Sequence, residues 1–194
     1  MVRSGIWRDW APKMMNGFQV TGKAIGVVGM GRVGQIVARR ARGFDMVVHY
    51  HNRKRLPEDL EQGAIYHESL ASLLSVVDVL SLNCPATKDN INLINRETIA
   101  CMKPGSILVN TARGALVDED ALLEALNSGV ISAAGLDCFK QEPGGNSALS
   151  ELSQVFMLPH IGSATDDTRK AMGFRALDNL DQFFKGDRPQ DLLN

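Results

Sequence analysis

The chain has 194 residues, which is enough for one domain with a substantial buried core. A hydrophobic content of 44% and a charged content of 22% are ordinary for a globular protein, and the net charge of −1 gives no electrostatic reason to expect nucleic acid or an anionic membrane as a partner. No apolar stretch approaches the roughly 20 residues of a membrane span, and the N-terminus does not resemble a signal peptide, so we expect a cytoplasmic location.

The three cysteines are far apart in the sequence. Cys84, Cys101 and Cys138 show neither C-x-x-C spacing nor a histidine pair beside them. This pattern argues against a zinc site and against a disulfide framework, and it favours a reducing compartment. We therefore expect no metal centre.

In chain order, an irregular lead-in over residues 1–22 is followed by alternating strands and helices. Short apolar runs typical of buried strands fall at 24–29, 46–50, 76–82, 106–110, 131–136 and 155–158. Helical patterns fall at 31–41, 68–74, 96–102, 118–128 and 165–184. This alternation predicts an α/β fold with a doubly wound, parallel sheet of the Rossmann type over residues 23–163, closed by a helix and tail over 164–194.

A G-x-G-x-x-G motif lies between the first expected strand and the first expected helix. Its glycines are Gly29, Gly31 and Gly34, and the residues between them include Arg32 and Val33. In this context the first glycine makes a tight turn, the second lets the backbone approach a pyrophosphate, and the third lets the helix pack on the strand. The motif predicts a dinucleotide site, with a purely structural turn as the alternative.

The end of the second expected strand bears on the choice of cofactor. An NAD site usually has an acidic residue about 20 residues after the glycines, which binds the ribose 2′-hydroxyl. Here residues 49–55 contain no acid, and the first one is Glu58. Asn52 with Arg53 and Arg55 would instead bind a 2′-phosphate through charge-assisted hydrogen bonds. We predict NADP(H) as the preferred cofactor, with NAD(H) possible.

Three chemically useful side chains follow three successive strands, where ligands bind in open α/β sheets. Arg113 could hold a carboxylate, His160 could donate a proton to a carbonyl oxygen, and Glu142 could keep that histidine protonated. Taken singly, each has another interpretation: a surface arginine, a structural histidine and a glutamate that caps a turn. Together with the glycine motif they predict hydride transfer to a 2-oxo acid.

Over nearly its whole length the chain resembles the D-isomer-specific 2-hydroxyacid dehydrogenase family. The similar segments are the glycine motif at 29–34, N-T-A-R-G at 110–114, D-x-F-x-x-E-P at 137–143 and P-H-I-G-S-A-T at 159–165. The resemblance implies that Arg113 binds the substrate, that His160 is the general acid/base, and that Glu142 is its partner. Glutamate at 142 argues against the formate dehydrogenase branch, which has glutamine there.

The resemblance also implies further contacts to the cofactor. Asp137 and the backbone at 111–113 would face the nicotinamide, and residues 82–87 would line the cofactor cleft. With the motif residues, the expected cofactor-binding set is Gly29, Gly31, Arg32, Val33, Gly34, Asn52, Arg53, Arg55, Cys84, Pro85, Thr111, Ala112, Arg113, Asp137, His160 and Ser163.

Within the family, residues 50–53 and the lead-in at 5–12, with Trp7, Trp10 and Pro12, look most like the glyoxylate and hydroxypyruvate reductases. Many members of that branch use NADPH, and members of the family pair as homodimers through the cofactor domain. The resemblance thus implies a small 2-oxo or 2-hydroxy acid as substrate and a homodimeric assembly.

Members of the family are usually longer and begin with most of a separate substrate domain. By this resemblance residues 1–22 are the link from that domain and residues 164–194 its returning helix and tail, so we expect most of that domain to be missing. Two hypotheses follow. The first is an NADPH-dependent reductase of glyoxylate or hydroxypyruvate, present as a cofactor-domain fragment. The second is a nucleotide-binding module without turnover, either a truncated relic or a cofactor-sensing interaction protein.

Overall fold

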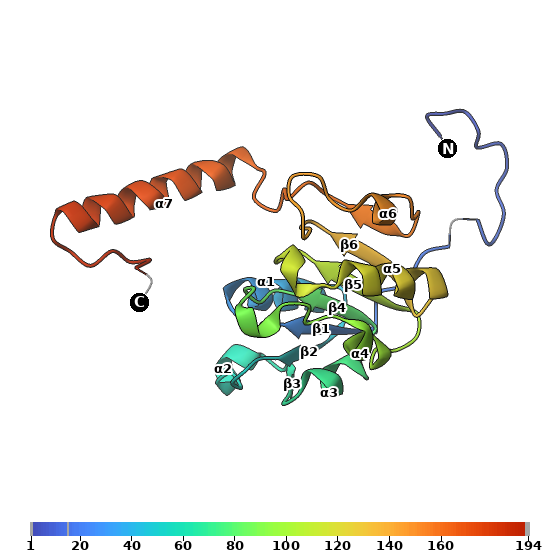
Figure 1. Ribbon diagram of the computed structural model, residues 1–194, viewed down its shortest axis with the longest axis horizontal. Coiled ribbons are helices and arrows are strands. Elements are labelled where there is room, and N and C mark those ends of the chain that lie inside the picture. The colour runs from blue at the N-terminus through green and yellow to red at the C-terminus, as the bar shows by residue number, and fades with distance from the viewer. Residues whose placement is uncertain (1, 15, 193–194) are drawn as a thin grey trace.

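The computed structural model describes residues 2–14 and 16–192 of the chain. Within these residues, seven strands form one fully parallel sheet in the order β3-β2-β1-β4-β5-β6-β7 (Figure 1). The strand order reverses between β1 and β4, and ligands bind at such switch points in open α/β sheets. The predicted Rossmann-type fold is confirmed.

The elements alternate along the chain as the sequence indicated. The strands are β1 (Ala24–Val28), β2 (Val47–His51), β3 (Ile65–His67), β4 (Val79–Leu82), β5 (Ser106–Asn110), β6 (Ile131–Leu136) and β7 (Val155–Met157). The helices are α1 (Arg32–Arg42), α2 (Glu58–Glu61), α3 (Leu70–Leu74), α4 (Arg96–Ala100), α5 (Glu119–Ser128), α6 (Ser147–Ser150) and α7 (Asp166–Phe184). Two short 3-10 turns, η1 (Lys88–Asn90) and η2 (Gly114–Leu116), complete the set.

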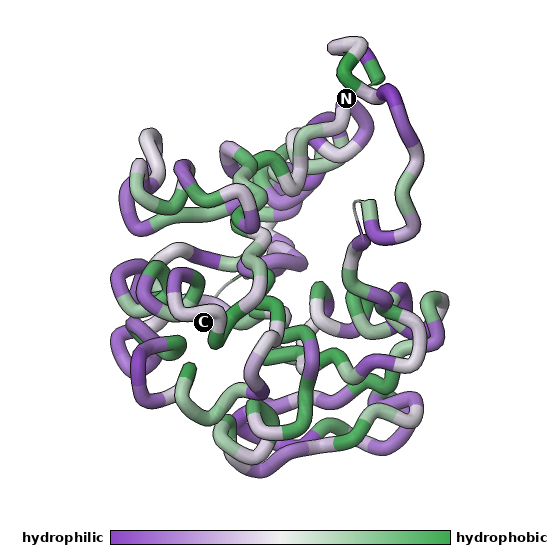
Figure 2. Tube along the Cα trace, turned by 90° about the vertical axis from the view of Figure 1, so that its right-hand side faces the viewer, coloured by the Kyte–Doolittle hydropathy of each residue, from purple (hydrophilic) through white to green (hydrophobic). Residues whose placement is uncertain are grey.

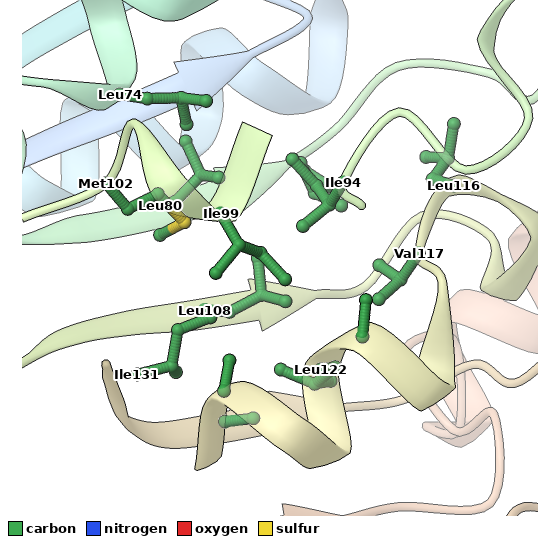
Figure 3. Close-up of a cluster of buried hydrophobic side chains, with 14 of the residues drawn as sticks. Leu74, Leu80, Ile94, Ile99, Met102, Leu108, Leu116, Val117, Leu122 and Ile131 are labelled. Carbon is green, nitrogen blue, oxygen red and sulfur yellow. The ribbon is translucent and has the colours of Figure 1, made fainter. Parts of the chain in front are cut away.

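Two apolar clusters cover the opposite faces of the sheet. The larger one joins β4, β5 and β6 to α3, α4, α5 and α6, and Figure 3 shows how Leu80 and Leu108 meet Ile99 and Leu122 inside it. The smaller one packs α1 against β1 and β2. Because neighbouring strand residues point to opposite faces, the sheet needs apolar residues at nearly every position, which explains the continuous apolar runs in the sequence.

Several short elements differ from the prediction. The helix expected at 68–74 begins at Leu70, where Ser69 caps it, and the preceding residues form the unpredicted edge strand β3. The strand expected at 76–82 begins at Val79, because residues 75–76 form a turn after α3 in which the Val76 amide donates to the Leu73 carbonyl oxygen. The four-residue helices α2 and α6 are too short to produce a helical pattern in the sequence.

The closing helix α7 extends away from the sheet, on the side opposite to the N-terminal arm, which comprises residues 2–14 and 16–22 (Figure 1). None of its residues is buried, and its exposed side chains include Phe174, Phe183 and Phe184. The arm also exposes Trp7 and Trp10, and hydrophobic stretches are visible along it in Figure 2. The assignment of residues 1–22 and 164–194 to a second domain stays a prediction.

A search of the described residues for membrane-crossing helices finds none with the required length and apolar character.

Candidate functional site

The glycine turn links β1 to α1 under tight steric limits. Gly29 has a φ of 92°, and a Cβ there would lie 2.6 Å from the Cys84 amide nitrogen, so the turn fits only glycine. A Cβ on Gly34 would collide with the Gly29 carbonyl oxygen, which is the close approach of helix to strand that the motif predicts. Around Gly31, by contrast, a Cβ would meet no atom within 4 Å. The open space at the second glycine is where a pyrophosphate would need room.

The N-terminus of α1 fits an anion. Gly31 occupies the N-cap position without a side chain to bond the first amides, and no acidic residue lies in the first turn. Arg32, which opens the helix, and Val33 are both exposed. The uncapped N–H groups and the positive end of the helix dipole are therefore available, and they match the charge of a dinucleotide pyrophosphate.

Asn52 connects the end of β2 to the glycine turn. Its Oδ1 accepts a hydrogen bond of 2.7 Å from the Met30 amide, so the oxygen is used inside the protein. The Nδ2 group remains as the free end of the amide and can only donate. Arg53, directly after it, is exposed and makes no ion pair among the described residues. A donor beside a cation suits a phosphate better than the hydroxyl of a ribose.

Arg55 has a partner that the sequence did not reveal. Its Nε and Nη2 donate to the two carboxylate oxygens of Glu61, at 2.8 and 3.0 Å. The expectation that Arg55 binds the 2′-phosphate stays a prediction, in which only the guanidinium edge turned away from Glu61 would contact the phosphate. A carboxylate does lie near this turn, nine residues after Asn52, but its oxygens are turned toward Arg55 and Tyr50.

A cleft of about 680 Å³ opens at the carboxyl ends of β4, β5 and β6. The predicted site residues that line it are Val33, Cys84, Pro85, Thr111, Ala112, Arg113 and Glu142, and the lining also includes Asn83, Ala86, Gly114, Ala115, Phe139 and Lys140. Burial raises the pKa of the Cys84 thiol, so this part of the wall is neutral. The structure therefore brings together segments that are more than a hundred residues apart in the sequence.

The loop that carries Arg113 is held by Asn110, a buried residue at the end of β5. The side chain of Asn110 accepts from the Ala112 amide and donates to the Arg113 carbonyl oxygen, at 3.1 and 2.9 Å. Next in the chain, Gly114 packs so closely on Phe139 that a Cβ would collide with its backbone. The exposed Arg113 side chain bonds the Ala112 carbonyl oxygen through Nη1, which leaves its other N–H groups for a ligand.

His160 and Glu142 form a hydrogen-bonded pair. His160 Nδ1 lies 2.6 Å from Glu142 Oε2, and the other oxygen of Glu142 accepts from the Phe139 amide at 2.7 Å. These two hydrogen bonds lower the pKa of Glu142, so the carboxylate is charged at neutral pH. His160 also has a φ of 54°, an uncommon backbone conformation for a residue with a side chain. The pair leaves Nε2 of the ring available.

Glu142 lies between two cavities. It lines the cleft just described, and with His160 it also lines a second cavity of about 550 Å³, whose wall includes Phe139, Pro143 and Met157. The histidine is half exposed, with 50% of its side-chain surface accessible, and the glutamate is 33% exposed. A small molecule can therefore reach the pair.

Asp137 supports the backbone that follows His160. Its side chain is buried, and its two oxygens accept from the amides of Ile161 and Gly162, both at 2.8 Å. The expected approach of Asp137 to the nicotinamide stays a prediction. Asp137 holds that backbone, and so it fixes where the histidine lies.

Glu119 is a site residue that sequence reasoning missed. It lies in the first turn of α5, and its two oxygens accept from the Lys140 amide and from Asn146, at 2.7 and 2.9 Å. The segment that it holds carries Glu142. Only the three-dimensional arrangement connects these residues, so no motif in the sequence indicates the role.

The remaining predicted residues lie outside the cavity walls. Ser163 is half-buried in the turn before α7, and Asn52, Arg53 and Arg55 lie around the end of β2. In the part of the chain that the structure describes, no three His, Cys, Asp or Glu side chains are grouped so that they could hold a metal ion.

Comparison with known proteins places this arrangement in a family. Residues 1–162 match the model of the D-isomer specific 2-hydroxyacid dehydrogenase NAD binding domain. A glyoxylate reductase from Thermococcus litoralis is 43% identical over 197 residues, which cover 100% of this chain and 60% of that protein. The chain thus spans about 60% of the length of this relative.

Solved structures show the same similarity. The crystal structure described as a D-isomer specific 2-hydroxyacid dehydrogenase from Polaromonas sp. JS6 66 superposes with a TM-score of 0.94 at 42% identity, covering 100% of this chain and 61% of that one. An NADPH-dependent glyoxylate/hydroxypyruvate reductase from Sinorhizobium meliloti gives a TM-score of 0.79 at 37% identity, covering 84% and 50% of the two chains. With its glycine turn, cleft and His160–Glu142 pair, the chain belongs to the D-isomer specific 2-hydroxyacid dehydrogenase family.

Proposed function

We propose that this protein is an NADPH-dependent reductase of a small 2-oxo acid, with glyoxylate or hydroxypyruvate as the substrate. The observation that carries the proposal is the His160–Glu142 pair, at 2.6 Å, on the rim of the cleft lined by Arg113. A proton donor, its carboxylate partner and a cation are the groups that the reduction of a 2-oxo acid requires.

The preference for NADPH is supported by the turn after β2. The usual acidic ribose ligand is replaced by Asn52, whose oxygen is engaged with Met30, and Arg53 next to it is exposed. NADH would find neither the carboxylate nor a replacement for it there, whereas a 2′-phosphate would find a cation and an amide donor. A relative whose structure is described as NADPH-dependent agrees with this reasoning.

The glycine turn and the N-terminus of α1 would hold the pyrophosphate of the cofactor, and residues 84–85 and 111–113 would line its path along the cleft. NADPH, when bound, supplies the hydride that reduces the carbonyl carbon. Arg113 pairs with the substrate carboxylate through the N–H groups that Ala112 does not use. These contacts place the 2-oxo group beside the imidazole.

His160 gives its proton from Nε2 to the carbonyl oxygen, so that the hydride and the proton together convert the 2-oxo acid into the 2-hydroxy acid. Glu142 accepts the N–H of Nδ1, which fixes the orientation of the ring and stabilises the imidazolium before transfer. Asp137 and Glu119 act through the backbone, because they hold the loops that carry His160 and Glu142.

The assembly is part of the proposal. A homodimer is supported by the exposed apolar surface of α7 and of the arm around Trp7 and Trp10, since a surface of this kind favours association. The cytoplasmic location is supported by Cys84, Cys101 and Cys138, all of which are free thiols.

The test is to mix the purified chain with NADPH and glyoxylate and to follow the loss of cofactor absorbance, with hydroxypyruvate in parallel. Turnover that disappears in His160→Ala, while the affinity for NADPH is unchanged, supports the proposed mechanism. Undiminished turnover in that variant refutes the role of His160.

A second candidate function is a nucleotide-binding module without turnover. The half-exposed His160 favours it, because hydride transfer normally takes place where water is excluded. Binding of NADPH without reaction toward either acid would support this candidate for the chain as it stands.

A further inference from the structure

Glu61 is a buried carboxylate outside the cleft, and the proposed mechanism does not use it. It ends the short helix α2, and only 5% of its surface is exposed. Buried carboxylates are rare unless they are paired, because removing the charge from water is costly. The hydrogen-bond partners of Glu61 therefore indicate its role.

Three neighbouring groups converge on Glu61. The Tyr50 hydroxyl donates to Oε1 at 2.6 Å, and Arg55 donates to both oxygens through Nε and Nη2. The Tyr50 oxygen also accepts from the Leu56 amide at 3.0 Å, and the Arg42 side chain donates to the Glu61 carbonyl oxygen at 2.9 Å. Since the Tyr50 ring is fully buried, the network connects the core of the domain to the turn at 52–56.

The geometry of the pair leaves one edge of Arg55 available. A guanidinium has five N–H groups, and this one uses its Nε side against Glu61. The Arg55 side chain is still 64% exposed, whereas that of Glu61 is 6% exposed, so the unused Nη1 edge has access to solvent. An arginine held in this way by a carboxylate can bind a second anion without losing its first partner.

Glu61 itself is not a ribose ligand. Both of its oxygens accept hydrogen bonds from the protein, and the side chain lies beneath the turn. Its hydrogen bonds with Arg55 and Tyr50 lower the pKa of Glu61 to about 2, and they raise the pKa of Arg55, so both partners are charged at neutral pH. The carboxylate near the turn at 52–56 therefore holds the Arg55 side chain in place.

We propose that Glu61 is a positioning residue for NADPH, which holds Arg55 so that its free edge binds the 2′-phosphate beside Arg53 and Asn52. This inference rests on the proposed preference for NADPH. It assigns to the Tyr50–Glu61–Arg55 network a role in cofactor selection that goes beyond holding α2 in place. NADH has the same pyrophosphate and lacks only the 2′-phosphate, so it reports separately on the rest of the site.

The experiment measures the dissociation constants of NADPH and NADH for the whole chain and for Glu61→Gln. Glutamine keeps the shape and can still accept from Tyr50, but it removes the charge that orders Arg55. We expect NADPH binding to weaken about 10-fold, the effect of losing roughly 1.4 kcal/mol of charge-assisted hydrogen bonding, with NADH binding unchanged. Asp59→Asn is the matched control: it removes the same charge from an exposed residue of the same helix and should change neither constant.

A second pair of variants isolates the route through Arg55 and keeps the test valid if Glu61→Gln does not fold. Arg55→Ala changes an exposed side chain and should weaken NADPH about 10-fold while sparing NADH. In the Arg55→Ala background, Glu61→Gln should have no further effect on the ratio of the two constants.

The outcomes separate the two proposals. A wild-type chain that binds NADPH no more tightly than NADH overturns the proposed cofactor preference. A wild-type chain that prefers NADPH, with a ratio that neither Glu61→Gln nor Arg55→Ala changes, overturns the role of Glu61 alone. A reduced affinity for both cofactors in Glu61→Gln, with the ratio preserved, means that the network only supports the fold. This result also overturns the positioning role of Glu61.

Discussion

His160 Nδ1 lies 2.6 Å from Glu142 Oε2, and the second oxygen of Glu142 is fixed by the Phe139 amide. The carboxylate therefore cannot turn away from the ring without giving up a backbone hydrogen bond. This pairing leaves Nε2 as the ring nitrogen that can exchange a proton with a ligand, and the proposed acid–base step therefore takes place at Nε2.

Replacing Glu142 with Gln should lower the turnover of glyoxylate by about 10- to 100-fold at neutral pH, because the positive imidazole loses its partner. Steady-state rates between about pH 5 and 9 check this, in a form of the protein that turns over glyoxylate. Because its two hydrogen bonds lower the pKa of Glu142, the carboxylate stays charged over that range. Unchanged turnover in the variant would remove Glu142 from the mechanism.

The glycines of the turn should separate into two kinds. Gly31→Ala meets no atom within 4 Å and should fold with nearly unchanged stability, but its methyl group should impede the pyrophosphate and weaken cofactor binding about 10-fold or more. Gly34→Ala collides with the Gly29 carbonyl oxygen and should destabilise the fold by about 2 kcal/mol. Chemical denaturation and NADPH titration of both variants make the comparison. Equal loss of stability in both would contradict the assignment.

Asp137→Asn should lower both stability and turnover. An asparagine places an N–H group against one of the two amides, Ile161 or Gly162, which leaves a buried donor without an acceptor. We expect a loss of about 2 kcal/mol in the free energy of unfolding, together with slower turnover as His160 loses its fixed position. Asp89→Asn, which neutralises an exposed aspartate, is the control. A variant with wild-type stability would show that the two amide contacts are dispensable.

A histidine pair at the sheet edge should make stability depend on pH. His49 Nδ1 lies 2.9 Å from His67 Nε2, and burial lowers the pKa of each ring. Repulsion adds to this effect, from His67 and Lys103 on His49 and from His51 on His67. The unfolded chain then binds more protons than the folded one below the ordinary histidine pKa of about 6.5, so stability should fall as the pH drops through this value. Urea denaturation between about pH 5 and 8 measures the slope, which should be smaller in His67→Asn. An equal slope in both proteins would assign the effect to other groups.

Much of the fold could be predicted because burial on both faces of a parallel sheet demands continuous apolar strands. The runs around Val27 and Leu108 carry that pattern clearly, and long helices such as α5 carry the 3.6-residue period. The missed strand β3 has three residues, and the missed helices α2 and α6 have four each. Segments of this length acquire their structure from neighbours, through contacts such as those of Tyr50 with Glu61.

The residues of the candidate site also fall into two groups, those that could be predicted from the sequence and those that could not. Gly29, Gly34 and the His160–Glu142 pair follow from local motifs, because backbone geometry and chemistry restrict the residue type at each position. The supporting carboxylates do not. Asp137 and Glu61 act through partners 24 and 6 residues away, and their oxygens are assigned only by the folded arrangement. The residues of the motifs and of the proposed acid–base pair were therefore easier to predict than the carboxylates that hold their loops in place.

The proposed preference for NADPH depends on the turn after β2, where Asn52 takes the place of the usual acidic residue. The most direct measurement is a titration of the 194-residue chain with NADPH and NADH, repeated for Asn52→Asp, which keeps an oxygen for the Met30 amide but adds a negative charge. The wild-type chain should bind NADPH about 10-fold more tightly, and the variant should reverse the order, since a carboxylate repels the 2′-phosphate and accepts from the ribose hydroxyl. A wild-type chain that binds NADH as tightly as NADPH, or more tightly, would contradict the account.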